Sequence, residues 1–192
     1  MRKVIVSNLI SLDGFIGRAN GDIDWFVTNE EFFEDTPDQL DEADTFLFGR
    51  VTYEGMASYW PTQAAISDQP EIAERMNRFA KVVFSKTLDQ ADWNNSRLVK
   101  SDLGAEVARL RQQPGKDMLI FGSGQIVAAL TQLGLIDEYR IFLNPVILGS
   151  GRPMFAGVTT SPRLRLLATK PLKSGVVALT YAPEAGRTSE SG

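Results

Sequence analysis

Short apolar runs recur along the chain and are separated by longer stretches of mixed polarity. Each run is rich in branched or aromatic residues and ends in, or leads into, a glycine, asparagine or hydroxyl residue, which is typical of buried strands. The runs cover residues 3–10, 45–48, 81–85, 97–100, 118–121 and 138–143. Two later runs, 163–169 and 175–181, are joined by a short turn, so the pattern predicts an antiparallel pair there.

Segments between the runs predict helices. They lie at 29–34, from 49 onward, and at 71–79, 102–112 and 125–133. Thr28 is the expected cap of the acidic first helix, and Pro70 is expected at the start of the third. Because strands and helices alternate while the last two strands lack a crossover helix, we expect an α/β fold. Its central sheet should be mostly parallel but mixed, and flanked by helices.

The chain is predicted to form one domain followed by a short tail. No internal repeat or low-complexity linker divides residues 1–182, and a chain of 192 residues is long enough for a sizeable core. Residues 183–192 are small and polar, which predicts a flexible tail.

The residue types that the chain lacks narrow its chemistry. With no cysteine and no histidine, it has no thiol nucleophile, thiolate zinc site, serine–histidine–aspartate triad or ordinary catalytic zinc. Proton transfer near neutral pH is then left to carboxylates, lysine, tyrosine, water or a cofactor. We therefore expect no bound metal.

Charge and hydropathy exclude two classes of partner. The net charge is −4, and the 20 lysines and arginines are scattered rather than gathered in a stripe, so nucleic acid is not expected. No apolar run reaches the roughly 18 residues of a membrane span, and residues 1–7 do not resemble a secretory signal. The expectation is a cytoplasmic protein that binds a small molecule.

Three of the predicted strands end beside residues suited to phosphate. These ends are Phe48-Gly49-Arg50, Phe84-Ser85-Lys86 and Phe121-Gly122-Ser123-Gly124. In an α/β sheet, ligands bind where the carboxyl ends of strands meet loops and helix N-termini. Glycine lets a ligand approach the backbone closely, and a helix N-terminus attracts anions. Three such turns together predict a site for a long anionic dinucleotide, although the common GxGxxG fingerprint is absent.

Five short motifs follow one another along the chain: Ser11–Gly17 (SLDGFIG), Asp24-Trp25, Gly49–Glu54 (GRVTYE), Phe84-Ser85-Lys86 and Ile120–Gln125 (IFGSGQ). Their order resembles the dihydrofolate reductase superfamily. The later segment Asn144–Phe155 (NPVILGSGRPMF) resembles the branch related to the C-terminal reductase domain of the bifunctional riboflavin-biosynthesis enzyme. The resemblance runs from Lys3 to Tyr181 and implies a three-layer dihydrofolate reductase-like fold.

NADPH is the cofactor that this resemblance implies. It places Arg50 near the adenosine phosphate, Thr52 near the pyrophosphate or nicotinamide, and Ser85 and Lys86 at the 2′-phosphate. The other implied cofactor-binding residues are Leu9, Ile16 and Gly17 at the nicotinamide, Gly49 beside Arg50, and Gly122, Ser123, Gly124, Gln125 and Ile126 under the pyrophosphate. Arg50 and Lys86 favour NADPH over NADH, because NADH recognition would favour a carboxylate at the ribose hydroxyl.

Candidate substrate residues follow the first loop. Trp25 and Phe26 are expected to wall a planar substrate. Dihydrofolate reductases keep a carboxylate shortly after the corresponding tryptophan, and here the candidate proton donors are Asp24 and Glu30. A carboxyl would need a pKa raised by desolvation against the aromatic pair, so water is the alternative donor.

The activity implied by the resemblance is NADPH-dependent hydride transfer to a small substrate, as in 5-amino-6-(5-phosphoribosylamino)uracil reductase of riboflavin biosynthesis. Two alternatives stay open: dihydrofolate reductase proper, and a non-catalytic nucleotide-binding protein of the same fold. The deaminase half of the bifunctional enzyme is not expected, because its zinc requires histidine and cysteine. Relatives in the riboflavin branch use the region of Pro145–Phe155 in dimers, so a homodimer is expected.

Overall fold

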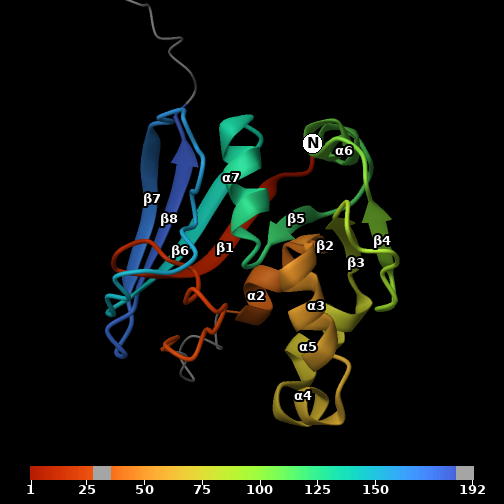
Figure 1. The fold of residues 1–192 in the computed structure, drawn as a ribbon, viewed down its shortest axis with the longest axis horizontal. Helices are drawn as coiled ribbons and strands as arrows, with labels where there is room; N and C mark the ends of the chain where they lie inside the picture. Colours follow the sequence, from red (N-terminus) through yellow and green to blue (C-terminus); the bar gives the residue numbers. More distant parts are fainter. Residues whose placement is uncertain (28–35, 185–192) are drawn as a thin grey trace, which may run out of the picture.

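The computed structural model describes residues 1–27 and 36–184. Its centre is an eight-stranded sheet in the order β4-β3-β2-β5-β1-β6-β8-β7 (Figure 1). The strands are β1 (Val4–Ser11), β2 (Ala43–Gly49), β3 (Ala80–Phe84), β4 (Ser96–Val99), β5 (Asp117–Ile120), β6 (Glu138–Asn144), β7 (Leu164–Pro171) and β8 (Val177–Pro183).

The sheet is parallel from β4 to β6 and antiparallel at the β8–β7 edge. At this edge, Tyr139 of β6 pairs with Tyr181 of β8, which pairs in turn with Leu166 of β7. The predicted mixed, mostly parallel sheet is therefore confirmed. Its antiparallel edge arises because the short turn between β7 and β8 leaves no room for a crossover helix.

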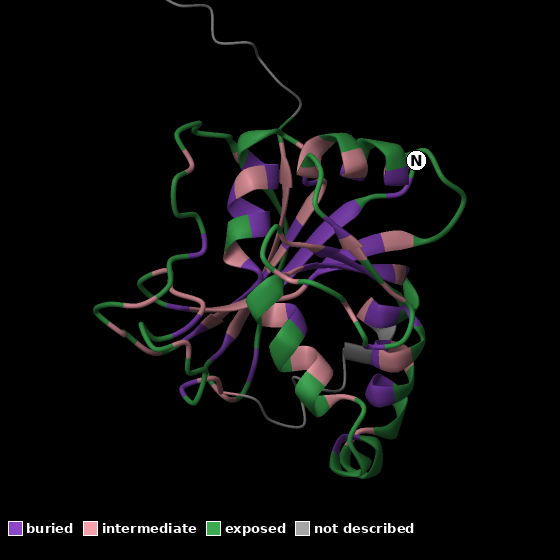
Figure 2. Ribbon diagram, turned by 45° about the vertical axis from the view of Figure 1, so that its right-hand side comes forward, coloured by how far each residue is buried: buried purple, intermediate pink, exposed green. Residues whose placement is uncertain are grey.

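Helices cover both faces of the sheet and give the fold three layers. They are α2 (Thr36–Asp41), α3 (Arg50–Tyr59), α4 (Gln63–Asp68), α5 (Pro70–Arg78), α6 (Leu103–Arg111) and α7 (Gly124–Gln132). Side chains from α6 and α7 join one apolar core, and side chains from α2, α3 and α5 join the other. Figure 2 shows the buried residues concentrated in the central strands between these layers. Within the described ranges, no helix has the length and apolarity to cross a membrane.

Strand β1 shows how the sequence builds two cores at once. Val4 and Val6 are fully buried in the core under α7, whereas Ile5 between them is buried in the core under α5. Successive side chains of a strand point to opposite faces, so a strand covered on both sides needs an almost continuous apolar run. That requirement is why the apolar runs in the sequence locate the strands.

The helix predictions hold in part. The helices predicted at 71–79, 102–112 and 125–133 correspond to α5, α6 and α7, and the one predicted from 49 onward corresponds to α3. Two short helices, α2 and α4, were not predicted. The acidic helix predicted at 29–34, with its Thr28 cap, lies outside the described residues. β8 continues to Pro183, one residue beyond the predicted end of the domain at 182.

An ion-pair network joins β4 to α6 and makes stability depend on pH. Glu106 contacts Arg97 and Arg109. The hydrogen bond to Arg109 and, to a smaller extent, the one to Arg97 outweigh the effect of burial and lower the pKa of Glu106 to about 2. A carboxyl with a depressed pKa in the folded state stabilises the fold above its unfolded pKa and loses this contribution as pH falls.

Glu106→Gln is therefore expected to lower the free energy of unfolding by about 1 kcal/mol at pH 7. The difference from wild type should vanish as pH falls from 4.5 to about 2, the window between the ordinary and the shifted pKa. Urea denaturation at a series of pH values measures it. Glu54→Gln, which breaks a more exposed pair with Arg50, is the control and should change stability by less. A deficit that persists at pH 2 would contradict the assignment.

Candidate functional site

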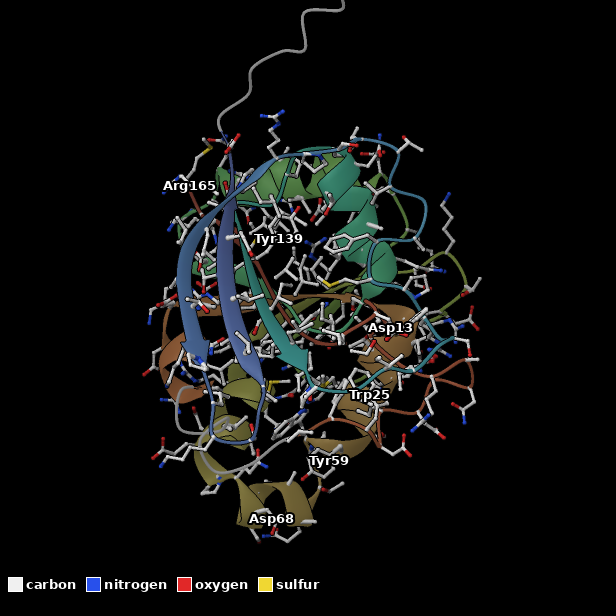
Figure 3. The ribbon with its side chains drawn as sticks, turned by 90° about the vertical axis from the view of Figure 1, so that its left-hand side faces the viewer. Asp13, Trp25, Tyr59, Asp68, Tyr139 and Arg165 are labelled. Carbon is white, nitrogen blue, oxygen red and sulfur yellow. The ribbon has the colours of Figure 1, made fainter. Side chains whose placement is uncertain are left out.

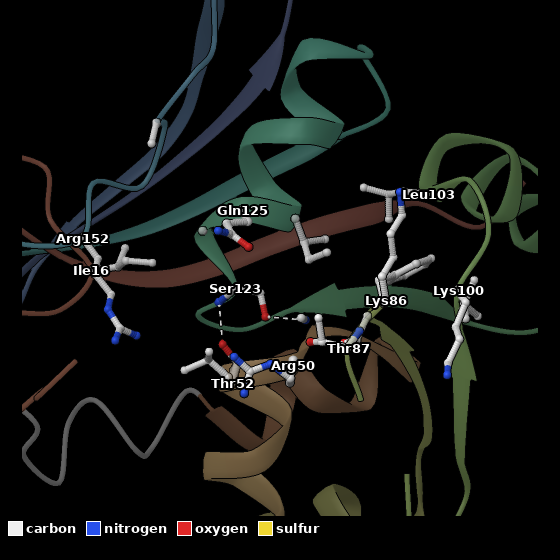
Figure 4. Close-up of a pocket in the computed structure, with 18 of the residues that line it drawn as sticks. Ile16, Arg50, Thr52, Lys86, Thr87, Lys100, Leu103, Ser123, Gln125 and Arg152 are labelled. Atoms are coloured by element: carbon white, nitrogen blue, oxygen red, sulfur yellow. Dashed lines mark hydrogen bonds between the residues drawn. The ribbon is translucent and has the colours of Figure 1, made fainter. Parts of the chain in front are cut away.

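A cleft of about 1130 Å³ opens at the carboxyl ends of β2, β3 and β4 (Figure 4). Segments that follow three other strands complete its wall. They contribute Ser123 and Gly124 after β5, Ile16 after β1, and residues 151–153 after β6. The carboxyl ends of parallel strands meet at one edge of a sheet, and that edge is where α/β proteins bind ligands. The position of the cleft thus follows from the topology.

Two helices point their N-termini into this cleft. α3 begins after Gly49 and α7 begins after Ser123, and neither N-cap residue supplies a side-chain cap. The first N–H groups of a helix have no acceptor within the helix, and the helix dipole adds partial positive charge there. By contrast, Asp102 caps α6, its carboxylate accepting a hydrogen bond from the Ala105 N–H at 2.7 Å. The uncapped ends of α3 and α7 leave N–H groups available to an anion.

Hydrogen bonds hold these two turns against each other. The Thr52 hydroxyl accepts from the Ser123 N–H at 2.9 Å, and the Ser123 hydroxyl accepts from the Gly49 N–H at 3.1 Å (Figure 4). Gly122 has a φ of +60°, and a Cβ there would lie 3.1 Å from the Thr52 side chain. Glycine at 122 therefore permits both the turn and the close approach of α3.

Four cationic side chains line the cleft: Arg50, Lys86, Lys100 and Arg152. Arg50 pairs with Glu54 one helical turn away, at 3.0 Å. Among the described residues, no carboxylate pairs with any of the other three. The cleft is therefore positive in a chain whose net charge is −4, and it suits an anionic ligand.

Asp13 fastens the loop after β1 to the loop after β6. Its carboxylate accepts hydrogen bonds from the Ser11 hydroxyl at 2.6 Å and from the N–H groups of Leu148 at 3.2 Å and Gly149 at 2.7 Å. The Ser11 bond, followed by the backbone bonds, holds the pKa of Asp13 below its usual value. Asp13 is thus a structural residue that holds two loops, distant in the sequence, together as one wall of the cleft.

The wall is closed by backbone contacts between the same loops. The Ile16 N–H donates to the Arg152 carbonyl at 2.9 Å, and the Arg152 N–H donates to the Gly17 carbonyl at 2.8 Å. A Cβ at Gly151 would lie only 2.4 Å from the Gly17 carbonyl oxygen. These contacts fix Ile16 and Arg152 on the cleft side of the wall.

Most residues predicted to bind the cofactor meet in this cleft. They are Ile16, Gly49, Arg50, Thr52, Ser85, Lys86, Ser123, Gly124, Gln125 and Ile126. Gly17 and Gly122 lie behind the lining and support it by backbone hydrogen bonds. The Gly17 carbonyl accepts from the Arg152 N–H, and the Gly122 carbonyl accepts from the Asn8 side-chain amide at 2.8 Å. Leu9 is elsewhere: it packs against Phe142 in a separate small core. The Ser85 hydroxyl accepts from the N–H groups of Thr87 and Leu88, which shapes the turn that carries Lys86.

The predicted substrate residues lie outside the lining of the cleft. Trp25 is buried and Phe26 is half-buried, with their rings edge to face at 4.4 Å. The indole N–H of Trp25 is buried and finds no acceptor among the described residues. Asp24 is exposed and pairs with Arg18 at 2.7 Å, so it is not desolvated against the aromatic pair. Glu30 lies outside the described residues.

Two lining cations were missed from the sequence. Lys100 follows β4 just as Lys86 follows β3, so the strand-end rule that selected Lys86 could have selected it. Arg152 stands inside the Asn144–Phe155 motif, but only the loop pairing reveals that it faces the cleft. In the described ranges, no group of three or more acidic residues is arranged to hold a metal ion.

Comparison with known proteins gives relatives over nearly the whole chain. The family model described as RibD C-terminal domain matches residues 2–178. The uncharacterized protein YyaP of Bacillus subtilis is 32% identical over 180 residues, covering 94% of each chain. A putative riboflavin biosynthesis protein from Shewanella sp. PV-4 has a TM-score of 0.77 at 22% identity, covering 95% of this chain and 99% of its own. Dihydrofolate reductase from Enterococcus faecalis, complexed with NADP(H), has a TM-score of 0.64 at 16% identity, covering 95% and 97%.

Proposed function

Because this chain belongs to the RibD C-terminal domain family, we propose that it is an NADPH-dependent reductase that acts on a small substrate. The reaction that we expect resembles that of 5-amino-6-(5-phosphoribosylamino)uracil reductase. When bound, NADPH supplies a hydride from C4 of its nicotinamide, and the acceptor is an electrophilic carbon such as C=N or the open-chain aldehyde of a ribosylamine.

The observation that carries the proposal is the convergence of two uncapped helix N-termini in one cationic cleft. NADPH fits this arrangement because it is long and carries phosphates at two places. The ends of α3 and α7 suit a pyrophosphate, while Lys86 and Lys100 suit the 2′-phosphate. No carboxylate in the described part of the chain pairs with either lysine, so their charge is available to a ligand.

In this reaction the protein mainly binds and orients the reactants. Ile16 and the glycine turn at Gly124 lie close together, since a Cβ at 124 would be 2.7 Å from the Ile16 Cδ1. This contact narrows the cleft beside the first turn of α7 and restricts how the nicotinamide half can lie. Holding two reactants in one geometry supplies a large part of a reductase's rate enhancement. Asp24, Glu30 and water stay alternatives for the proton donor. Asp24 is exposed and pairs with Arg18, so it lacks the desolvation that would favour Asp24 as the donor.

The proposal is tested by titrating the protein with NADPH and then screening substrates at constant cofactor. We expect micromolar or tighter NADPH binding and NADPH oxidation by a ribosylamino-pyrimidinone phosphate. Oxidation by dihydrofolate instead would identify a dihydrofolate reductase. Tight binding with no turnover would favour the non-catalytic nucleotide-binding alternative, and failure to bind NADPH would refute the proposal.

Lys86→Ala is expected to weaken NADPH binding about tenfold or more and to leave NADH binding nearly unchanged. Charge-assisted contacts to an ionised partner are worth about 1.5–3 kcal/mol each, and only NADPH carries the 2′-phosphate. Fluorescence titration of each cofactor measures the ratio. Lys3→Ala, which removes an exposed lysine before β1, is the control. Equal losses for both cofactors would show that Lys86 is structural.

The homodimer stays a prediction. Within Pro145–Phe155, Ile147 is 70% exposed and Phe155 is 42% exposed, which supports this segment as the contact. Light scattering over a range of protein concentrations measures the assembly, and a monomer at every concentration would exclude it.

A further inference from the structure

Arg152 lies at the end of the cleft opposite the lysines, and no carboxylate within residues 1–27 or 36–184 pairs with its guanidinium. We propose that Arg152 binds the phosphate on the nicotinamide side of the cofactor's pyrophosphate, and so acts as a second, separate anchor for the dinucleotide. The proposal rests on the proposed NADPH function and assigns Arg152 a role within it.

The backbone of Arg152 is fixed on both sides. Its N–H donates to the Gly17 carbonyl and its carbonyl accepts from the Ile16 N–H. These bonds tie the residue to the loop after β1, and Asp13 ties that same loop to Leu148 and Gly149 upstream of Arg152. The side chain therefore leaves the wall from a defined point.

The guanidinium lies against a glycine. A Cβ at Gly21 would stand 2.8 Å from Nη2 and 3.2 Å from Nη1 of Arg152, and Gly21 has a φ of +95°. The nearby acidic side chains have other partners: Asp24 pairs with Arg18, and Asp22 accepts from the Asn20 amide at 2.6 Å. Arg152 thus rests on bare backbone with its charge uncompensated by any described carboxylate, an arrangement that suits an incoming anion.

The loop that carries Arg152 passes directly over the start of α7. A Cβ at Gly124 would lie 3.4 Å from the Pro153 carbonyl oxygen and 3.6 Å from that of Met154. The residue before them, Arg152, lines the same cleft as Gly124 and Gln125. The guanidinium and the free N–H groups of α7 can therefore serve one phosphate from two sides.

The topology decides which phosphate this is. Lys86 and Lys100 follow β3 and β4, on one side of β5, whereas Arg152 is held by the loops after β1 and β6, on the other side. Figure 4 shows Arg152 and Ile16 on one side of the Ser123 turn, and Lys86 and Lys100 on the other. If the lysines hold the 2′-phosphate, Arg152 is nearer to the phosphate farther from the adenosine.

The test compares two adenosine ligands that differ by one phosphate. 2′,5′-ADP carries the 2′-phosphate and the adenosine-side phosphate, and 2′-phosphoadenosine 5′-diphosphate adds the phosphate assigned to Arg152. Arg152→Ala should weaken NADPH and the diphosphate about tenfold and leave 2′,5′-ADP within about twofold, while Arg152→Lys should retain most of the binding. Isothermal titration measures all three ligands.

Arg165→Ala is the matched control. Arg165 is an exposed arginine on β7, away from Asp13 and the loops that it joins (Figure 3), and its removal should change no affinity. Equal weakening of 2′,5′-ADP and the diphosphate, or no weakening of either, would overturn the role given to Arg152. Wild-type protein that binds none of the three ligands would instead refute the proposed function, so the two failures are distinguishable.

Discussion

Gly151→Ala is expected to lower the free energy of unfolding by about 2–3 kcal/mol and to weaken NADPH binding more than tenfold. The added methyl group would lie 2.4 Å from the Gly17 carbonyl oxygen and 3.2 Å from the Phe15 ring. Because the first of these neighbours is backbone, relief requires the two loops to separate. Separation would break the bonds that Arg152 makes to Ile16 and Gly17 and would open the wall of the cleft.

The measurements are urea denaturation and NADPH titration on the same preparations. Gly55→Ala is the control, since Gly55 lies within α3 and a Cβ there meets nothing within 4 Å. The same substitution should stabilise the protein at this site by about 0.5–1 kcal/mol, because alanine favours a helix more than glycine does. If Gly151→Ala is as stable as wild type and binds NADPH normally, the paired loops do not form a wall of the cleft.

The strands could be predicted from the sequence because burial on both faces requires almost continuous apolar runs. β1, β2, β3, β5 and β6 are each visible in this way. The short helices α2 and α4 lack such a signal. α4 has only six residues, and its start is marked by the Thr62 hydroxyl, which accepts from the Ala65 N–H at 3.3 Å. Short helices depend on packing that a sequence pattern does not show.

Most of the cleft lining was predictable for a related reason. Residues such as Thr52, Lys86 and Ser123 directly follow buried strands or open the next helix, so the strand pattern places them at one edge. Arg152 was not predictable from this rule, because its position depends on hydrogen bonds to Gly17 and Ile16, more than 130 residues away in the chain. Leu9 also belongs to β1, but its side chain packs in a core on the sheet face away from α7, so its predicted contact with the cofactor stays a prediction.

Lys81 lies outside the lining of the cleft, at the start of β3. It is fully buried, and its Nζ donates to the carbonyls of Asn77 at 2.8 Å, Phe79 at 2.9 Å and Asn94 at 3.2 Å. The ammonium also lies 4.3 Å from the centre of the Trp93 ring. Asn77 and Phe79 mark the end of α5, where carbonyls lack helical partners and attract a cation. Lys81 therefore ties the end of α5 to the segment before β4.

Lys81→Met is accordingly expected to lower the free energy of unfolding by about 2–4 kcal/mol at pH 7. Methionine fills similar space but leaves the three carbonyls without their donor, and a buried unsatisfied polar group costs about 1–3 kcal/mol.

Burial lowers the pKa of Lys81 from 10.5 to about 8. Between these values the unfolded chain binds a proton that the folded chain does not, so this residue makes wild-type stability rise with pH. The deficit of Lys81→Met should thus grow as pH is raised from 8 to 10.5, whereas the exposed control Lys3→Met should follow wild type. Urea denaturation at pH 7 and from pH 8 to 10.5 measures these differences. A variant as stable as wild type at pH 7, or a deficit that shrinks with rising pH, would show that Lys81 does not stabilise the end of α5 as a hydrogen-bond donor.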